Sequence, residues 1–235
     1  MRKTKLTLAC IVGTRGCFSA DLARSGRKQL LDAVKAAGHK AVILPVTETP
    51  TGAIETLADA RKCADLFNQH RNEIDGVIVS LPNFGDELGI INALHWARLG
   101  VPVLVQACDD DLDKLGTKQR RDSFCGKISV CCNLRQYGIP FTDTATHTVA
   151  LDSPAFAQDL ARFANVCRVT NGLRNARIGA IGARPGAFQT VRAREKLLQA
   201  SGVAVVPVDL SEIIAAAGRV DVRSARAKKQ LAAMK

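Results

Sequence analysis

Short apolar runs alternate with helix-like segments along most of the chain, and this alternation constrains the fold more than any other feature. Residues 6–12 form an apolar run that ends at Gly13, and residues 21–37 then carry apolar side chains at helical spacing as far as Gly38. The order repeats, with strands expected at residues 41–44, 76–80, 101–105 and 139–141 and helices at 53–71, 85–99, 123–137 and 154–169. The apolar runs show little polar alternation, which is typical of strands buried on both faces. The sequence therefore predicts an α/β fold, an open parallel sheet of the flavodoxin or Rossmann type with helices on both faces.

A second unit of the same class is expected to follow. Asn171-Gly172 is a helix stop and a candidate hinge, so residues 1–171 are predicted to form the amino-terminal α/β domain. Residues 172–235 then show strand, helix, strand and helix patterns, the opening β-α-β-α of another domain. Two strands and two helices cannot cover both faces of a sheet, so this second domain is expected to be incomplete.

Composition limits the cellular setting. The chain has 235 residues, of which 47% are apolar, yet no run approaches the roughly 18 apolar residues of a membrane helix. Its first ten residues lead directly into a strand pattern, which disfavours a signal peptide. Eight cysteines occur without a C-x-x-C pair, so reduced and mostly buried thiols are expected rather than a zinc site. We therefore expect a soluble, cytoplasmic protein with no membrane partner.

The net charge of +11 is concentrated near the carboxyl terminus. Residues 168–235 hold 13 Lys and Arg against 4 Asp and Glu, whereas residues 1–167 hold 20 against 18. Such a segment could bind a polyanion, with an affinity that falls steeply with salt. The cations are scattered, however, and the chain has one Trp and one Tyr, so base-stacking platforms and a nucleic-acid partner are not expected. An incomplete domain, whose acidic complement lies in sequence outside this chain, is the favoured explanation of the excess.

Three loops at the carboxyl ends of the predicted strands carry candidate ligand-binding side chains, because ligands of open parallel sheets bind there. Arg15 lies between Gly13 and Gly16 at the start of a helix, where anions or polar ligands are favoured. Asn83 follows the third strand and suits sugar hydroxyls, and His147 follows the fifth. The alternatives are a turn with a solvated Arg, an Asn turn before a helix, and a surface His.

Two further loops raise the question of other chemistry. Gln106 precedes Asp109, Asp110, Asp111 and Asp113, but these carboxylates lack calcium-loop spacing and a nearby His, so a solvated acidic turn is favoured over a metal site. The loop over residues 181–190 has glycines that admit a ligand close to the backbone. Neither this loop nor the first matches the Walker or dinucleotide-binding patterns, so nucleotide binding is not expected.

Four segments of the chain resemble the amino-terminal half of L-fucose isomerase-like proteins, relatives of the L-fucose and L-arabinose isomerases. The segments are LPNFGDE (81–87), RRDSFCGKISV (120–130), LRQYGIPFT (134–142) and IGARPGAFQTVR (181–192). The resemblance implies an aldose–ketose isomerase in which Mn²⁺ or a similar divalent ion polarises the sugar while carboxylates move a proton through an enediol. It also implies a homo-oligomer, trimeric or hexameric when full length.

The resemblance carries sugar-binding regions onto this chain but no catalytic centre. In the family the metal ligands belong to the carboxyl-terminal half, so no metal ligand and no catalytic base is assigned here. The loops bearing Arg15, His147, and Arg184 with Gln189 correspond to regions that line the sugar site. We expect these residues, with Asn83, to bind a monosaccharide rather than transfer protons.

Two hypotheses follow from these expectations. The chain is either the amino-terminal portion of a sugar isomerase, as a fragment or the product of a split gene, or a non-catalytic sugar-binding or regulatory module. An adjacent reading frame with Glu, Asp and His in isomerase order would favour the first.

Overall fold

The computed structural model describes residues 5–116 and 118–234, which divide into two compact units at Asn171. Each unit is described by itself. Within the described residues, none of the helices is both long and apolar enough to cross a membrane.

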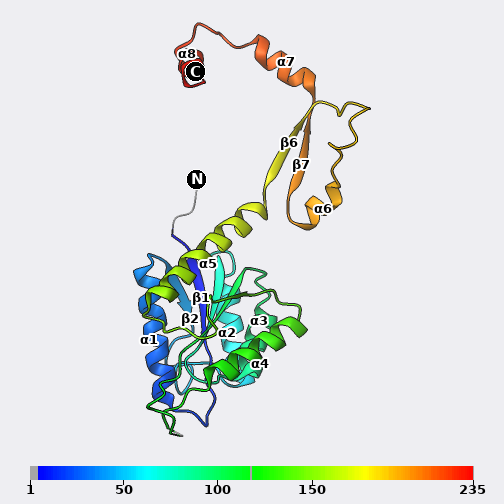
Figure 1. The fold of residues 1–235 in the computed structure, drawn as a ribbon. Coiled ribbons are helices and arrows are strands. Elements are labelled where there is room, and N and C mark those ends of the chain that lie inside the picture. Colours follow the sequence, from blue (N-terminus) through cyan, green and yellow to red (C-terminus); the bar gives the residue numbers. More distant parts are fainter. Residues whose placement is uncertain (1–4, 117, 235) are drawn as a thin grey trace. The chain divides into compact units, whose positions relative to one another are not determined.

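The first unit is a five-stranded parallel sheet with helices on both faces (Figure 1), which confirms the predicted fold class. The strands lie in the order β2-β1-β3-β4-β5, and every neighbouring pair is parallel. The elements are β1 (Thr7–Val12), α1 (Ala20–Ala36), β2 (Lys40–Ile43), α2 (Leu57–Gln69), β3 (Gly76–Leu81), α3 (Glu87–Ala97), β4 (Val103–Ala107), α4 (Ser123–Gln136), β5 (Thr142–Asp143) and α5 (Pro154–Leu173).

The core consists of two layers, one on each face of the sheet. Along β1, Ala9 and Ile11 point to the layer covered by α2, α3 and α4, whereas Leu8 and Cys10 point to the layer covered by α1 and α5. Because alternate residues of a strand face opposite sides, a strand buried on both faces needs apolar residues throughout. All six residues of β1 and of β3 are buried, which explains the unbroken apolar runs in the sequence.

The helix stop predicted at Asn171-Gly172 is wrong, because α5 continues through both residues to Leu173. Local signals also shift other element boundaries from their predicted positions. The helix expected from residue 53 begins at Leu57, because Thr56 and Asp59 form a capping box and Ile54 bridges Gly13 in an extended conformation. The strand expected at residues 139–141 is instead Thr142–Asp143. Ile139 is still occupied in closing α4, since its N–H donates to the carbonyl of Leu134, so pairing with β4 begins only at Thr142.

The first unit also contains an internal repeat with an offset of 100 residues. The segment β1-α1-β2-α2 corresponds to β4-α4-β5-α5, and β3 lies between the two halves. Gly26 of α1 and Gly126 of α4 both pack against the loop that follows β3, at Pro82 and Phe84 respectively. The equivalent helices lie on opposite faces of the sheet, because α1 covers one face and α4 covers the other. The loop after β3 is therefore held from both sides by equivalent helices.

The second unit has little buried surface of its own. Its strands β6 (Arg177–Ile181) and β7 (Ala204–Val208) are parallel, and it includes helices α6 (Glu195–Ala200), α7 (Leu210–Gly218) and α8 (Ala225–Ala233). Val203 is the one buried residue among those described after residue 171. Ile178 and Ile181 of β6 are 50% and 61% exposed. The unit therefore folds a sheet whose apolar side chains remain largely uncovered.

Candidate functional site

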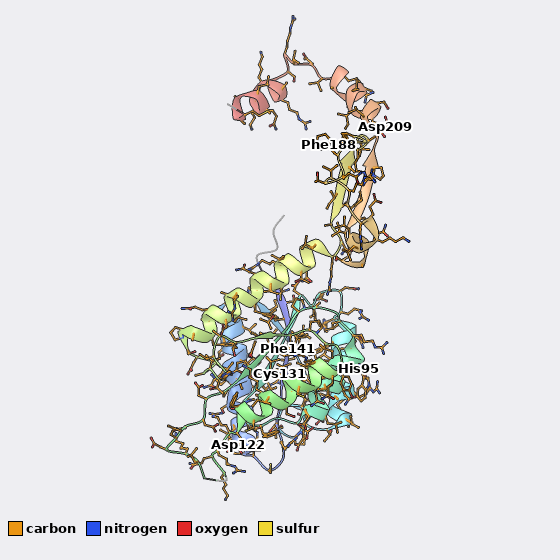
Figure 2. The ribbon with its side chains drawn as sticks, turned by 45° about the vertical axis from the view of Figure 1, so that its right-hand side comes forward. His95, Asp122, Cys131, Phe141, Phe188 and Asp209 are labelled. Atoms are coloured by element: carbon orange, nitrogen blue, oxygen red, sulfur yellow. The ribbon has the colours of Figure 1, made fainter. Side chains whose placement is uncertain are left out.

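The loops that follow the five strands meet at one edge of the first sheet, because all of its strands are parallel and end there. The segments after β1, β3, β4 and β5 hold the polar residues described below. Backbone hydrogen bonds join them: Gly13 donates to Ser80, Cys108 to Leu81 and Val149 to Ala107. Asp122, labelled in Figure 2, marks the start of α4 at this edge. The strand order reverses between β1 and β3, and such a reversal is where open α/β sheets bind ligands.

Arg15 lies at this reversal and is held by three side chains from the neighbouring loop. Its guanidinium donates to Glu87 at 2.6 Å and lies 3.5 Å from the carboxylate of Asp86. It also stacks over the ring of Phe84, 4.4 Å from the ring centre. The side chain remains 32% exposed. Arg15 is thus held by two carboxylates and a ring while part of its side chain stays exposed to solvent, and its contact with a sugar stays a prediction.

Asn83 joins two loops beneath this surface. Its side chain is fully buried; the amide N–H donates to Thr14 Oγ1 at 3.0 Å, and the amide oxygen accepts from the N–H of Gly85 at 3.1 Å. Buried polar groups that are fully paired stabilise one arrangement of the chain. Direct contact between Asn83 and a sugar stays a prediction; in this structure the side chain sets the relative positions of the Arg15 and Phe84 loops.

His147 lies on the exposed side of the loop after β5. Its ring stacks against Phe124, with ring centres 5.1 Å apart. Its backbone carbonyl accepts a 2.8 Å hydrogen bond from the ammonium group of Lys127, a residue that is only 3% exposed. Lys127 also donates to Thr144 Oγ1 at 2.7 Å and pairs with Asp143. A buried ammonium with three oxygen partners therefore anchors the loop that presents the imidazole.

The acidic loop after β4 uses its carboxylates to shape itself. Asp110 accepts from the backbone N–H groups of Arg121 and Asp122, and Asp111 pairs with Lys114 at 2.8 Å. The pairing of Asp111 lowers its pKa, mainly through the hydrogen bond from Lys114. Within residues 5–116 and 118–234, no three His, Cys, Asp or Glu side chains gather as metal ligands would.

Deeper polar groups also connect the loops. Ser80 donates to the Gln106 side-chain oxygen at 2.6 Å, and the Gln106 amide donates to the carbonyl of Val149 at 2.7 Å. Arg121 donates to the carbonyl of Pro82 at 2.7 Å. Gln106 is thus a structural link between β3, β4 and the His147 loop rather than part of an acidic cluster.

Arg184 and Gln189 belong to the second unit. Both are exposed in the loop between β6 and α6, the loop of Phe188 in Figure 2. A sugar-binding role for these two residues stays a prediction.

Phe84, Phe124 and Lys127 contact the predicted residues at this edge of the sheet, and the sequence patterns did not single them out. Phe84 and Phe124 fall within the quoted motifs, and each supports one of the predicted polar residues. Lys127 lies inside a predicted helix rather than after a strand. The feature that could have identified Lys127 is the internal repeat, in which Arg27 lies 100 residues earlier at the equivalent position. Arg27 is likewise buried and donates to the carbonyls of Leu44 and Gly52.

Comparison with known proteins identifies relatives over most of the first unit. Residues 9–174 match the sequence model of the fucose/sulfoquinovose isomerase N-terminal domain. The sulfoquinovose isomerases of Priestia aryabhattai and Priestia megaterium are each 30% identical to the chain over 142 residues. The match covers 60% of this chain and 30% of each relative, so the chain spans about a third of the length of these relatives.

Proposed function

The chain belongs to the fucose/sulfoquinovose isomerase N-terminal domain family, and from this premise we propose that it supplies the sugar-binding portion of an aldose–ketose isomerase. The observation that carries the proposal is the edge of the first sheet, where Arg15 and His147 lie at the ends of β1 and β5, each supported by an aromatic ring. A cation and an imidazole can donate hydrogen bonds to hydroxyl groups, and exposed aromatic rings can pack against the apolar face of a pyranose.

In this proposal the residues of the chain bind and orient the sugar. Arg15 and His147 donate to hydroxyl oxygens, and Lys127 acts as a positioning residue that fixes the backbone of the His147 loop. We propose that Arg184 and Gln189 of the second unit also bind sugar hydroxyls. Substrates for testing are L-fucose, from the resemblance, and sulfoquinovose, from the names of the relatives.

The metal of the family does not fit the described part of this chain. A divalent ion such as Mn²⁺ needs several oxygen ligands at one point, whereas the carboxylates of Asp110 and Asp111 are committed to backbone and Lys partners. We propose that the ligands of the ion and the proton-transferring carboxylates come from polypeptide other than the residues described here. A complete enzyme is proposed to be a homo-oligomer.

Ketose formation tests the proposal. The chain is incubated with L-fucose or sulfoquinovose and Mn²⁺, with and without a carboxyl-terminal portion from a related isomerase, and the ketose is measured by NMR. Activity is expected only when the second portion is supplied, and it should fall at least tenfold for Arg15→Met and His147→Ala. Arg24→Met and His70→Ala, on the surface outside the site, serve as matched controls and should retain activity.

The alternative proposal is a non-catalytic sugar-binding or regulatory module that uses the same edge of the sheet without chemistry. This alternative is supported if the chain binds the sugar but forms no ketose with any carboxyl-terminal portion that is supplied. Turnover by the chain alone would contradict both proposals.

A further inference from the structure

The segments at the carboxyl edge of the first sheet are acidic, although the chain as a whole is basic. Residues 13–19, 44–56, 82–87, 108–122 and 144–153 together hold five Lys and Arg against ten Asp and Glu, while the whole chain has a net charge of +11. Charges gathered in one region sum to a local potential that attracts or repels a charged ligand. The negative charge is therefore a property of this edge and not of the protein in general.

Three carboxylates lie around Arg15. Glu87 accepts from its guanidinium at 2.6 Å, and a carboxylate oxygen of Asp86 lies 3.5 Å from it. Glu55 accepts from the backbone N–H of Gly16. An anion in contact with the guanidinium would lie within about 7 Å of Asp86 and Glu87, which is shorter than the screening length of about 10 Å at 0.1 M salt. A ligand anion at Arg15 is therefore repelled by these carboxylates.

The helix ends nearest Arg15 are also matched by side chains of the chain itself. Anions favour helix N-termini, where backbone N–H groups need acceptors. At α3, Asp86 accepts from the N–H of Leu88 at 2.9 Å, and Glu87 lies in the first turn. At α1, Ser19 accepts from the N–H of Asp21, whose carboxylate lies in the first turn. The positive ends of both helices are thus already complemented by acidic side chains.

We propose that this site selects a monosaccharide without an ionised group, and that Asp86 and Glu87 reject a sugar that bears a sulfonate or a phosphate. The inference rests on the proposed function and names its substrate class. A neutral sugar presents hydroxyl groups, which accept from Arg15 and donate to the carboxylates. Of the two sugars chosen for testing, L-fucose fits this surface, whereas the sulfonate of sulfoquinovose is repelled. Repulsion of the wrong ligand by a like charge is one of the two ways in which a binding site becomes specific.

A matched pair of sugars tests the selectivity. 6-Deoxy-D-glucose and sulfoquinovose share one ring configuration and differ by the sulfonate on C6. Titration of the ¹⁵N-labelled chain at low salt should give a dissociation constant at least tenfold lower for 6-deoxy-D-glucose. Asp86→Asn combined with Glu87→Gln should reduce the difference to about threefold or less, and Asn retains the capping role at α3. Asp65→Asn combined with Glu73→Gln removes the same charge from exposed positions outside the edge and should leave the difference unchanged.

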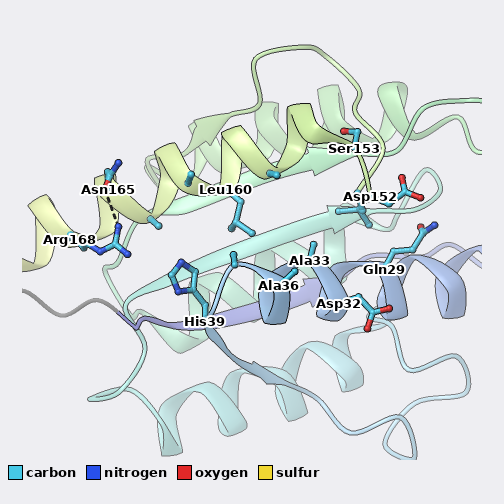
Figure 3. Close-up of a pocket in the computed structure, with 15 residues that line it drawn as sticks. Gln29, Asp32, Ala33, Ala36, His39, Asp152, Ser153, Leu160, Asn165 and Arg168 are labelled. Atoms are coloured by element: carbon cyan, nitrogen blue, oxygen red, sulfur yellow. Dashed lines mark hydrogen bonds between the residues drawn. The ribbon is translucent and has the colours of Figure 1, made fainter.

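A separate pocket of the first unit serves as an internal reference in these titrations. Helices α1 and α5 leave a pocket of about 750 Å³ between them (Figure 3), lined by residues such as Ala33, His39 and Leu160. Neither Arg15 nor His147 lines it. Amide shifts around this pocket are therefore distinguished, residue by residue, from shifts at the edge. Sugar-dependent shifts around this pocket alone would contradict the proposed function.

Sulfate separates the inference from the proposed function, because it probes the charge of the edge without a sugar. At constant ionic strength, sulfate up to the order of 50 mM should leave the amides of residues 14–17 unshifted in the wild-type chain and shift them saturably in the Asp86→Asn, Glu87→Gln variant. If neither sugar binds, the proposed function is contradicted and the sulfate titration still decides the inference. Sulfoquinovose binding as tightly as 6-deoxy-D-glucose, saturable sulfate binding at Arg15 of the wild-type chain, or a variant that still rejects sulfate would overturn it.

Discussion

Individual polar residues at the edge of the sheet have two kinds of environment. Arg15 and His147 keep solvent access while aromatic rings support them, whereas Asn83 and Lys127 are buried and joined to backbone or hydroxyl oxygens. The rule that loops after parallel strands bind ligands was enough to select Arg15, Asn83 and His147 from the sequence. The burial of Asn83 could not be foreseen, because it depends on Thr14 of a loop 69 residues away.

His39 gives a prediction at the residue scale. Its ring nitrogen accepts from the backbone N–H of Leu6, and burial with nearby Arg168 lowers its pKa in the folded chain. The unfolded chain therefore takes up a proton more readily, and stability is lost as pH falls below the ordinary value of about 6.5. His39→Gln should make the free energy of unfolding less dependent on pH between about 5 and 7, as measured with urea.

The control is His70→Gln, which removes a surface imidazole that is 40% exposed. This substitution should leave the contribution of His39 to the pH dependence of the free energy of unfolding unchanged. If the free energy of unfolding of His39→Gln depends on pH as strongly as that of the wild-type chain, the pKa of His39 is not lowered in the folded chain.

At the scale of elements, the alternation of apolar and helical patterns predicted the parallel sheet, and helix α4 was placed nearly to the residue. The start of α2 was misplaced because the apolar pair Ala53-Ile54 continues the helical pattern, while the capping box at Thr56 decides where the helix begins. The short β5 was misplaced because closure of α4 takes precedence at Ile139. Local capping therefore decided the boundaries that hydrophobic periodicity left undefined.

Gly126 gives a prediction at this scale. A Cβ atom there would collide with the carbonyl oxygen of Phe84, so Gly126→Ala should destabilise the first unit by about 3 kcal/mol. Gly172→Ala is the matched control, because a methyl group added to this helical glycine would have no neighbour within 4 Å, and it should change stability by less than about 1 kcal/mol. Equal effects of the two substitutions in urea unfolding would show that α4 does not pack closely on the loop after β3.

At the scale of the whole molecule, the two units differ in how well they bury their strands. The sheet of the first unit is covered on both faces, while β6 and β7 keep most of their apolar side chains exposed. The internal repeat in the first unit was present in the sequence as paired positions such as Gly38 and Gly138, yet it became evident only when the structure showed which helices are equivalent. Comparing the two halves residue by residue does not reveal the repeat, because few of the paired residues are identical.

Hydrogen exchange measures the difference between the two units directly. Amides of β1, β3 and β4 should exchange only through global unfolding, whereas those of β6 and β7 should exchange much faster through local opening. Peptides covering residues 6–105 and 177–234 can be compared by mass spectrometry in one experiment. Equal protection in the two regions would contradict the expectation that the second unit needs further polypeptide to cover it.

The central claim is that the edge formed by the loops after β1, β3 and β5 binds a monosaccharide, and chemical-shift mapping of the ¹⁵N-labelled chain tests it most directly. Titration with L-fucose or sulfoquinovose, at concentrations up to the order of 50 mM, is predicted to shift the amides around Arg15, Phe84 and His147. The shifts should disappear in His147→Ala and persist in His70→Ala. Shifts confined to other surfaces, or none with either sugar, would contradict the account.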